Sequence, residues 1–209
     1  AHIVLLQETL LDSCFDAKRW GLQWKHTCYW SFGTRRSAGV GILFGKNSNF
    51  TVDFVHYDYS GRLLVIDVHS GNAELRLINV YCSTVAAERP AFFHHSLQPY
   101  LSTSRSVVLG GDFNFVESLS LDKTGGDTTQ GNAGSNEWIR LRESARLIDA
   151  FRSLYPSQVS TTWSCPARRV ACRLDRFYVS SALKQSLCTV HNTPTAESDH
   201  SIVSLALHI

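Results

Sequence analysis

The chain has 209 residues, of which 44% are hydrophobic and 18% charged, and its formal net charge is +2 at pH 7. This composition supplies a sizeable apolar core and excludes a globally disordered chain. A charge so close to zero excludes a basic surface spread over the whole molecule, and no apolar run approaches the roughly 18 residues that a membrane-spanning helix needs.

Six cysteines are scattered along the chain without a C-x-x-C pair. This usage favours an intracellular, reducing environment and argues against a disulfide framework or a zinc site. The chain begins inside an apolar run and contains no methionine. We therefore expect residues 1–209 to be a single domain within a longer polypeptide.

Short apolar runs in the first half of the chain predict strands. They cover residues 3–6, 38–44, 51–59, 62–68 and 75–81. We expect a short helix within residues 10–25. A longer helix is predicted over residues 86–101, because Phe93, Leu97 and Leu101 recur at intervals of four.

The second half of the chain alternates strands and helices. Strands are predicted at residues 107–109, 161–163, 174–179 and 202–209. A helix begins near Trp138 and runs to about Leu154, whereas the Gly-, Thr- and Asn-rich residues 124–136 predict a mobile loop. The pattern is typical of a mixed α/β domain of packed sheets.

The stretch G-G-D-F-N directly follows the apolar run 107–109. If the chain stays extended, the spacing of two places Asp112 and Asn114 on one face, at the mouth of a sheet where open α/β folds hold their sites. The alternative is a polar turn, because Gly, Asp and Asn are common turn residues.

Polar residues recur at the ends of five predicted strands, namely Glu8, Tyr81, Asp112 with Asn114, Asp175, and Asp199 with His200. The alternative for a single one, such as Glu8, is an ordinary surface residue. Their recurrence indicates one site, because catalytic groups collect at one rim of a sheet.

Hydrolysis of a phosphodiester suits this set, since it needs a divalent cation, a base for water and donors for the phosphate. Glu8 and Asp199 would hold Mg²⁺. Asp112 would orient and deprotonate the water, and Asn114 would donate to the phosphate. Asp175 would hold His200 as imidazolium or in one tautomer. Whether Asp112 or His200 is the general base stays open.

Five motifs occur in the order typical of the exonuclease–endonuclease–phosphatase superfamily: Q-E-T at 7–9, N-V-Y at 79–81, G-D-F-N at 111–114, L-D-R-F at 174–177 and S-D-H at 198–200. Within it, the chain most resembles the endonuclease domain of LINE-type (non-long-terminal-repeat) retrotransposons. The features that point there are S-A-G-V-G-I-L-F at 37–44, S-L-D-K at 120–123 and T-W at 162–163.

The resemblance implies a four-layer α/β sandwich, in which two packed mixed sheets are flanked by helices. It implies Mg²⁺-dependent nicking of double-stranded target DNA, with Mn²⁺ as an alternative ion. The exposed 3′-hydroxyl would prime a reverse transcriptase domain of the same polypeptide, in the nucleus and without a membrane partner.

The same resemblance assigns residues to roles. Glu8 is the principal metal ligand, with Asp199 beside the metal. Asp112, Asn114 and Tyr81 act at the scissile phosphate, and Asp175 and His200 form a catalytic pair. Lys123 and Thr162 fall where such domains contact the DNA backbone.

Two departures from the family pattern stand out. The first strand of the family carries an asparagine, so we expect a strand and helix upstream of residue 1. Thr84 stands where relatives often have asparagine.

Four arginines cluster in and after the loop 164–171, namely Arg168, Arg169, Arg173 and Arg176. They are either a solvated charge run or a hairpin that grips DNA in a groove. The resemblance favours DNA binding, for which we single out Arg168, Arg169 and Arg173.

Three alternative functions remain from sequence. Two are enzymes of the same superfamily, an abasic-site repair endonuclease and an inositol-phosphate phosphatase. The phosphatase is disfavoured because L-D-R-F replaces the signature of that branch. The third is a nucleic-acid-binding module that has lost turnover, against which the joint presence of the six acidic, amide and histidine residues argues.

Overall fold

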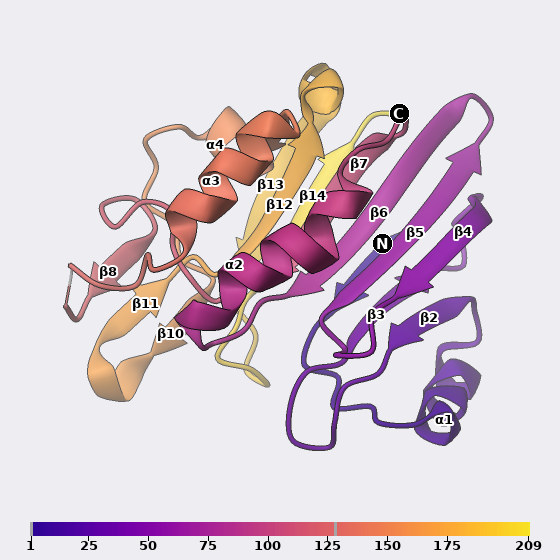
Figure 1. The fold of residues 1–209 in the computed structure, drawn as a ribbon, viewed down its shortest axis with the longest axis horizontal. Helices are drawn as coiled ribbons and strands as arrows, with labels where there is room; N and C mark the ends of the chain where they lie inside the picture. Colours follow the sequence, from indigo (N-terminus) through magenta and orange to yellow (C-terminus); the bar gives the residue numbers. More distant parts are fainter. Residues whose placement is uncertain (1, 128) are drawn as a thin grey trace. The chain divides into compact units, whose positions relative to one another are not determined.

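The computed structural model describes residues 2–127 and 129–209, which fall into two compact units. The first unit comprises residues 1–81 and 103–111, and the second comprises residues 82–102 and 112–209. Figure 1 shows that both contain sheets and helices, as the α/β prediction requires. No described helix is both long and apolar enough to cross a bilayer.

Two sheets build the first unit. Their strands are β1 (Ile3–Leu6), β2 (Cys28–Ser31), β3 (Val40–Phe44), β4 (Thr51–Tyr57), β5 (Leu63–Ser70), β6 (Ala73–Tyr81) and β7 (Ser106–Asp112). One sheet has the order β1–β3–β2, all antiparallel, and β4, β5, β6 and β7 lie side by side in that order. The five predicted strands of this half are confirmed within a few residues, and β2 was not predicted.

The two sheets of this unit pack face to face, with β3 against β5 and β6. Every residue from Leu63 to Val68 is buried, which explains why β5 is an unbroken apolar run apart from Asp67. Asp67 is compensated by Arg76, whose Nε lies 2.7 Å from its carboxylate on the neighbouring strand.

The predicted short helix is α1 (Cys14–Trp24). Its first turn is capped by Ser13, whose hydroxyl accepts the N–H of Asp16, and Lys25 ends it in the left-handed conformation.

Gly111 makes the closest backbone approach of the first unit. Its φ is +145°, and a Cβ built on it would lie 2.0 Å from the carbonyl oxygen of Val80. Only glycine fits between β6 and β7 at this point, which places the residue after it at the end of β7.

The second unit holds the remaining elements. Its strands are β8 (Lys123–Gly125), β9 (Leu147–Asp149), β10 (Trp163–Cys165), β11 (Val170–Cys172), β12 (Asp175–Ser180), β13 (Leu187–Thr193) and β14 (Ile202–Leu207). Its helices are α2 (Arg89–Ala91), α3 (Ser135–Ser144) and α4 (Ala150–Leu154), with 3₁₀ or π segments at Ala86–Glu88, Phe92–Leu97, Gln98–Tyr100, Pro166–Arg168 and Ser181–Ser186. Three antiparallel groups form: β10–β11–β8, β12–β9 and β13–β14.

Residues 86–100 are helical, as predicted, and Phe93 and Leu97 are fully buried. The segment is not a uniform α-helix, because Pro90 and Pro99 interrupt its hydrogen bonds. Figure 1 shows it running beside α3, where Phe93 and Trp138 stack with ring centroids 5.5 Å apart.

The single helix predicted from Trp138 to Leu154 is wrong. Helix α3 ends before Arg146, which has φ +53°, and β9 then pairs with β12. Asp149 caps α4 by accepting the N–H of Arg152 at 3.0 Å. The apolar spacing persists across the break because β9 also faces the core.

The predicted loop 124–136 is shorter than expected. Its first residues belong to β8, which pairs with β11, and its last belong to α3. Position 128 lies outside the described residues. The strands β8, β9, β11 and β13 were not predicted, because short strands of mixed polarity give no clear period.

Candidate active site

Within the G-D-F-N stretch, the chain turns directly after Asp112, the last residue of β7, as the alternative prediction held. Asn114 has φ +55°, and its N–H donates to Asp112 Oδ1 at 2.8 Å. The amide nitrogen Nδ2 of Asn114 donates to the carbonyl of Cys82 at 2.9 Å. Because asparagine tolerates the left-handed region, the turn fixes both functional side chains beside the end of β7.

Asp175 and His200 form a hydrogen-bonded pair. His200 Nδ1 lies 2.8 Å from Asp175 Oδ2. Asp175 is the first residue of β12, and His200 forms an isolated antiparallel bridge with Trp163 just before β14. This pairing is the one predicted from the L-D-R-F and S-D-H motifs.

Thr162 holds this pair in place. Its hydroxyl donates to Asp175 Oδ2 at 2.6 Å and accepts the main-chain N–H groups of Leu174 and Asp175 at 3.0 and 2.9 Å. Its main-chain carbonyl accepts the N–H of Ser201 at 2.6 Å. Thr162 is buried. The predicted contact of Thr162 with the DNA backbone is therefore wrong, because its side chain is enclosed and occupied by Asp175.

Asp112 joins the pair to complete a cluster of three side chains. One ligand atom each from Asp112, Asp175 and His200 lie within 4.8 Å of one another. Burial lowers the pKa of His200, but the hydrogen bond that its ring donates to Asp175 and the charges of Asp175, Asp112 and Asp199 more than offset it and raise that pKa to about 9. His200 is therefore an imidazolium at neutral pH.

Asp199 lies next to this cluster and is exposed. Trp163 Nε1 donates to Asp199 Oδ2 at 2.8 Å, and Ser164 N–H donates to the Asp199 carbonyl at 3.0 Å. The part that Trp163 plays was not predicted. The one sequence signal for it was the T-W pair at 162–163, in which this half-buried tryptophan directly follows Thr162.

Glu8 and Tyr81 come together in the first unit. The Tyr81 hydroxyl donates to Glu8 Oε1 in a short hydrogen bond, and Glu8 has φ +50°. The preceding residues are tied in the same way, since Gln7 Nε2 donates to Asn79 Oδ1 at 2.6 Å. Asn79 is buried and donates to the carbonyls of Leu6 and Gly41. The Q-E-T and N-V-Y motifs therefore meet.

The donor chemistry separates two groups of residues with respect to a metal. Mg²⁺ takes oxygen ligands, and Glu8 and Asp199 both offer exposed carboxylates. The cluster of Asp112, Asp175 and His200 is a poorer fit, because a protonated imidazole has no lone pair to give. Each of these two exposed carboxylates thus offers the kind of oxygen ligand that suits Mg²⁺.

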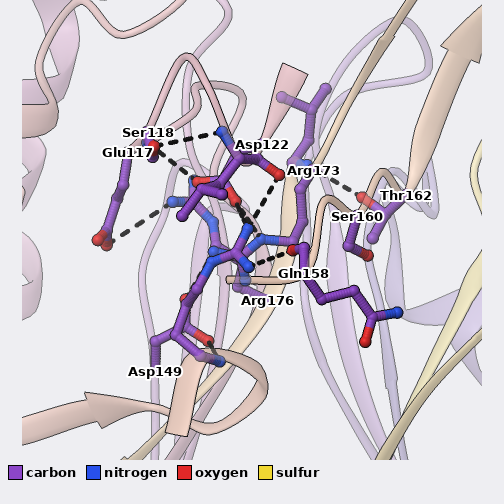
Figure 2. A network of polar contacts seen from close by, with 12 residues as sticks. Glu117, Ser118, Asp122, Asp149, Gln158, Ser160, Thr162, Arg173 and Arg176 are labelled. Atoms are coloured by element: carbon purple, nitrogen blue, oxygen red, sulfur yellow. Dashed lines mark hydrogen bonds and ion pairs between the residues drawn. The ribbon is translucent and has the colours of Figure 1, made fainter. Parts of the chain in front are cut away.

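Arg173 is not available to DNA, which corrects its predicted role. Its side chain is 2% exposed, with Nε 2.7 Å from Asp122 Oδ1 and Nη2 2.7 Å from Asp149 Oδ2 (Figure 2). Arg176 is also buried, between the rings of Phe113 and Phe115. The predicted cluster of four arginines is therefore two surface residues and two core residues.

Arg168 and Arg169 are exposed in the connection between β10 and β11. Arg169 takes the left-handed conformation with φ +50°, which turns the chain back into β11. Lys123, on the adjoining strand β8, is half-buried and donates to the carbonyls of Asp127 and Gln130. The roles of these three cations in DNA binding stay predictions.

A family model described as Endonuclease/Exonuclease/phosphatase family matches residues 1–200. The transposon TX1 uncharacterized 149 kDa protein of Xenopus laevis is 31% identical over 99% of this chain, which spans 16% of that protein. The likeness thus covers about one-sixth of a much larger polypeptide.

Solved structures resemble the chain over nearly its whole length. A 3′-5′ exonuclease (NExo) from Neisseria meningitidis has a TM-score of 0.78 and 22% identity, over 99% of this chain and 89% of that one. The AP endonuclease LMAP from Leishmania major has a TM-score of 0.79 and 19% identity, over 100% of this chain and 79% of that one. These likenesses confirm the predicted α/β sandwich class.

Proposed function

Because the chain belongs to the endonuclease/exonuclease/phosphatase family, we propose that it is a Mg²⁺-dependent DNA endonuclease encoded by a transposon. The observation that supports this most is the joining of Asp112, Asp175 and His200, with ligand atoms within 4.8 Å of one another. The likeness of the whole chain to a transposon protein favours a DNA target over a small phosphate ester.

In this proposal His200 donates a proton or hydrogen bond to the phosphate, because it is an imidazolium below about pH 9. Asp175 and Thr162 hold its ring in one orientation. The general base for the attacking water is then Asp112, since a protonated histidine cannot accept the proton. Asn114 donates its second amide N–H to a phosphate oxygen.

Glu8 and Asp199 would hold the metal ion, Mg²⁺ or in its place Mn²⁺. The ion would neutralise the charge that develops on the phosphate oxygens. Tyr81, whose hydroxyl is bonded to Glu8, would set the direction of that carboxylate.

The substrate is double-stranded DNA, gripped by Lys123, Arg168 and Arg169. Phosphate contacts of this kind orient a duplex without reading its sequence. The nick would leave a 3′-hydroxyl that primes a reverse transcriptase domain of the same polypeptide, and this chemistry would take place in the nucleus.

Nicking of supercoiled plasmid tests the proposal. The protein should convert supercoiled to open-circular DNA with Mg²⁺ and lose this activity with EDTA. Asp112→Ala should remove the activity, whereas Arg140→Ala on the exposed side of α3 should retain it. Equal nicking by the protein and Asp112→Ala would refute the assigned mechanism, and no nicking by any of them would indicate a binding module.

Abasic-site repair is the second candidate, favoured by the shared fold with an AP endonuclease. Two duplexes that differ only by one abasic site distinguish the functions. Cleavage confined to the abasic duplex would establish repair, and comparable cleavage of both would establish the transposon role.

A further inference from the structure

Arg89, at the start of α2, is a buried cation bonded to main-chain carbonyls. Its side chain donates to Ser83 O at 2.8 Å, Thr84 O at 3.2 Å, Asn114 O at 2.7 Å and Ala133 O at 2.6 Å. The residue is 4% exposed. A guanidinium fork with five N–H groups suits four acceptors that arrive from different directions.

These carbonyls belong to three separate stretches of the second unit. Ser83 and Thr84 follow the N-V-Y motif, Asn114 ends the G-D-F-N motif, and Ala133 lies just before α3. Arg89 therefore holds the turn that carries Asn114 against two neighbouring segments. This link is independent of the Asp175–His200 pair.

The electrostatics also connect Arg89 to the site. Burial and the like charge of Arg176 lower the pKa of Arg89, and the negative charge of Asp112 acts in the opposite direction. A buried guanidinium usually has a carboxylate partner. Within the described part of the chain, the hydrogen bonds of this guanidinium go to main-chain carbonyls, so its positive charge remains to act on Asp112 and on an anion near it.

The backbone of Asn114 is fixed on every side. Its carbonyl accepts from Arg89, its N–H donates to Asp112, and its side chain donates to Cys82 O. Losing the first of these bonds would leave a left-handed non-glycine residue with weaker support. The orientation of the amide that faces the phosphate would then loosen.

We propose that Arg89 is a positioning residue for Asn114, an inference that rests on the proposed phosphodiester cleavage. It acts by fixing the turn and by placing a positive charge behind it, not by touching the substrate.

Arg89→Lys tests this, because lysine keeps the charge but cannot reach four carbonyls. We expect kcat to fall about 10- to 100-fold with KM changed less than about threefold, since small displacements of a catalytic group have effects of this size. Arg140→Lys, an exposed control, should leave both constants unchanged. If Arg89→Lys does not fold, Arg89→Gln, which retains two donors, takes its place.

A double-mutant cycle excludes a merely structural role. If Arg89 acts through Asn114, the Arg89→Lys change should lower kcat by less than about twofold in an Asn114→Ala background. An equal fold-loss in both backgrounds would overturn the proposal. Kinetics would be compared at equal folded fraction.

Hydrogen exchange gives a readout that does not depend on the reaction. Arg89→Lys should speed exchange of peptides that cover residues 112–116, while peptides over β9 and α4 keep their protection. Unchanged exchange at 112–116 would overturn the inference even if the protein nicks DNA. Absence of nicking by the unaltered protein would overturn the proposed function alone.

Discussion

Two groups of acidic and basic side chains in the second unit use the same residue types for different ends. One group is the core ion network of Asp122, Asp149, Arg152 and Arg173, in which each carboxylate contacts a guanidinium. Figure 2 shows Asp122, Asp149 and Arg173 of this network. In the other, the site cluster of Asp112, Asp175, Asp199 and His200, the charges of three aspartates act on one imidazolium.

Charge balance separates them. Burial raises the pKa of Asp122, but the hydrogen bond and charge of Arg173 and the hydrogen bond of Arg152 more than offset it and lower that pKa. The core ion network is therefore ionised, matched and enclosed. The site cluster keeps an excess of negative charge near solvent, which attracts a cation and raises the pKa of histidine. Matched charges stabilise a fold, whereas unmatched ones are available for chemistry.

The largest expected effect comes from the site cluster. His200→Ala should lower kcat for plasmid nicking about 1000-fold, the scale of losing an acid–base group. The free energy of unfolding should change by only about 1 kcal/mol, because a partly exposed pair contributes little. Nicking assays with urea unfolding measure both, and a large stability loss would remove the contrast.

The core ion network should respond in the opposite way. Arg173→Met removes the guanidinium that contacts Asp149 and one of the two that contact Asp122, so the free energy of unfolding should fall by about 3–5 kcal/mol. Arg168→Met, on the exposed hairpin, is the matched control and should stay within about 0.5 kcal/mol. Similar losses from both substitutions in urea titrations would contradict the assignment of Arg173 to the core.

Thr162 is buried like the core ion network, but its hydroxyl donates to Asp175 of the site cluster. Thr162→Val removes the hydroxyl bonded to Asp175 and should lower kcat about tenfold, the equivalent of one hydrogen bond to a charged group. Thr162→Ser keeps the hydroxyl and should retain most of the activity. Steady-state nicking rates check this, and equal rates for the valine and serine variants would count against a role for the hydroxyl.

The raised pKa of His200 should also make the stability of the protein depend on pH. A histidine whose pKa is raised to about 9 in the folded state contributes stability that is fully present below its unfolded value of about 6.5. That contribution is lost as pH rises through about 9. Asp175→Asn removes the cause, so the difference in unfolding free energy between wild type and this variant should shrink over this window. A constant difference from about pH 6 to about pH 10 would contradict the raised pKa.

The smallest effect is expected at the hairpin. Arg168→Ala combined with Arg169→Ala should reduce the slope of log K against log salt by about 2 if both contact DNA phosphates. Fluorescence anisotropy with a duplex measures the slope.

Shortening residues 164–171 should alter the choice of nicking site while hydrolysis persists, and unchanged sites on a long duplex would refute a role in target choice.

Sequence patterns predicted which side chains lie together better than they predicted which are exposed. The pairing of Asp175 with His200 followed from motifs at strand ends, because short motifs carry their geometry with them. Glu8 and Tyr81 were assigned to one site, but the hydrogen bond between them was not predicted. The burial of Arg173 did not follow from the sequence, since a run of arginines has the same pattern whether its partners are water or distant carboxylates. Its partners Asp122 and Asp149 lie 51 and 24 residues away.

The fold shows the same division. Buried strands such as β5 and β7 were predicted from composition alone, whereas the break between α3 and α4 was not. That break depends on the pairing of β9 with β12, which is a long-range contact. The hydrophobic period of the local sequence cannot reveal this break, because Leu147 and Ala150 are buried on either side of the change from strand to helix.

The close approach of Gly111 to Val80 has a consequence for any mutational scan of this chain. Position 111 should tolerate no other residue because of stereochemistry, and position 112 should tolerate none because of the reaction. A scan that selects for activity would show the same loss for substitutions at both positions. Measurements on purified protein distinguish them, because Asp112→Ala should give a folded but inactive protein whereas Gly111→Ala should prevent correct folding.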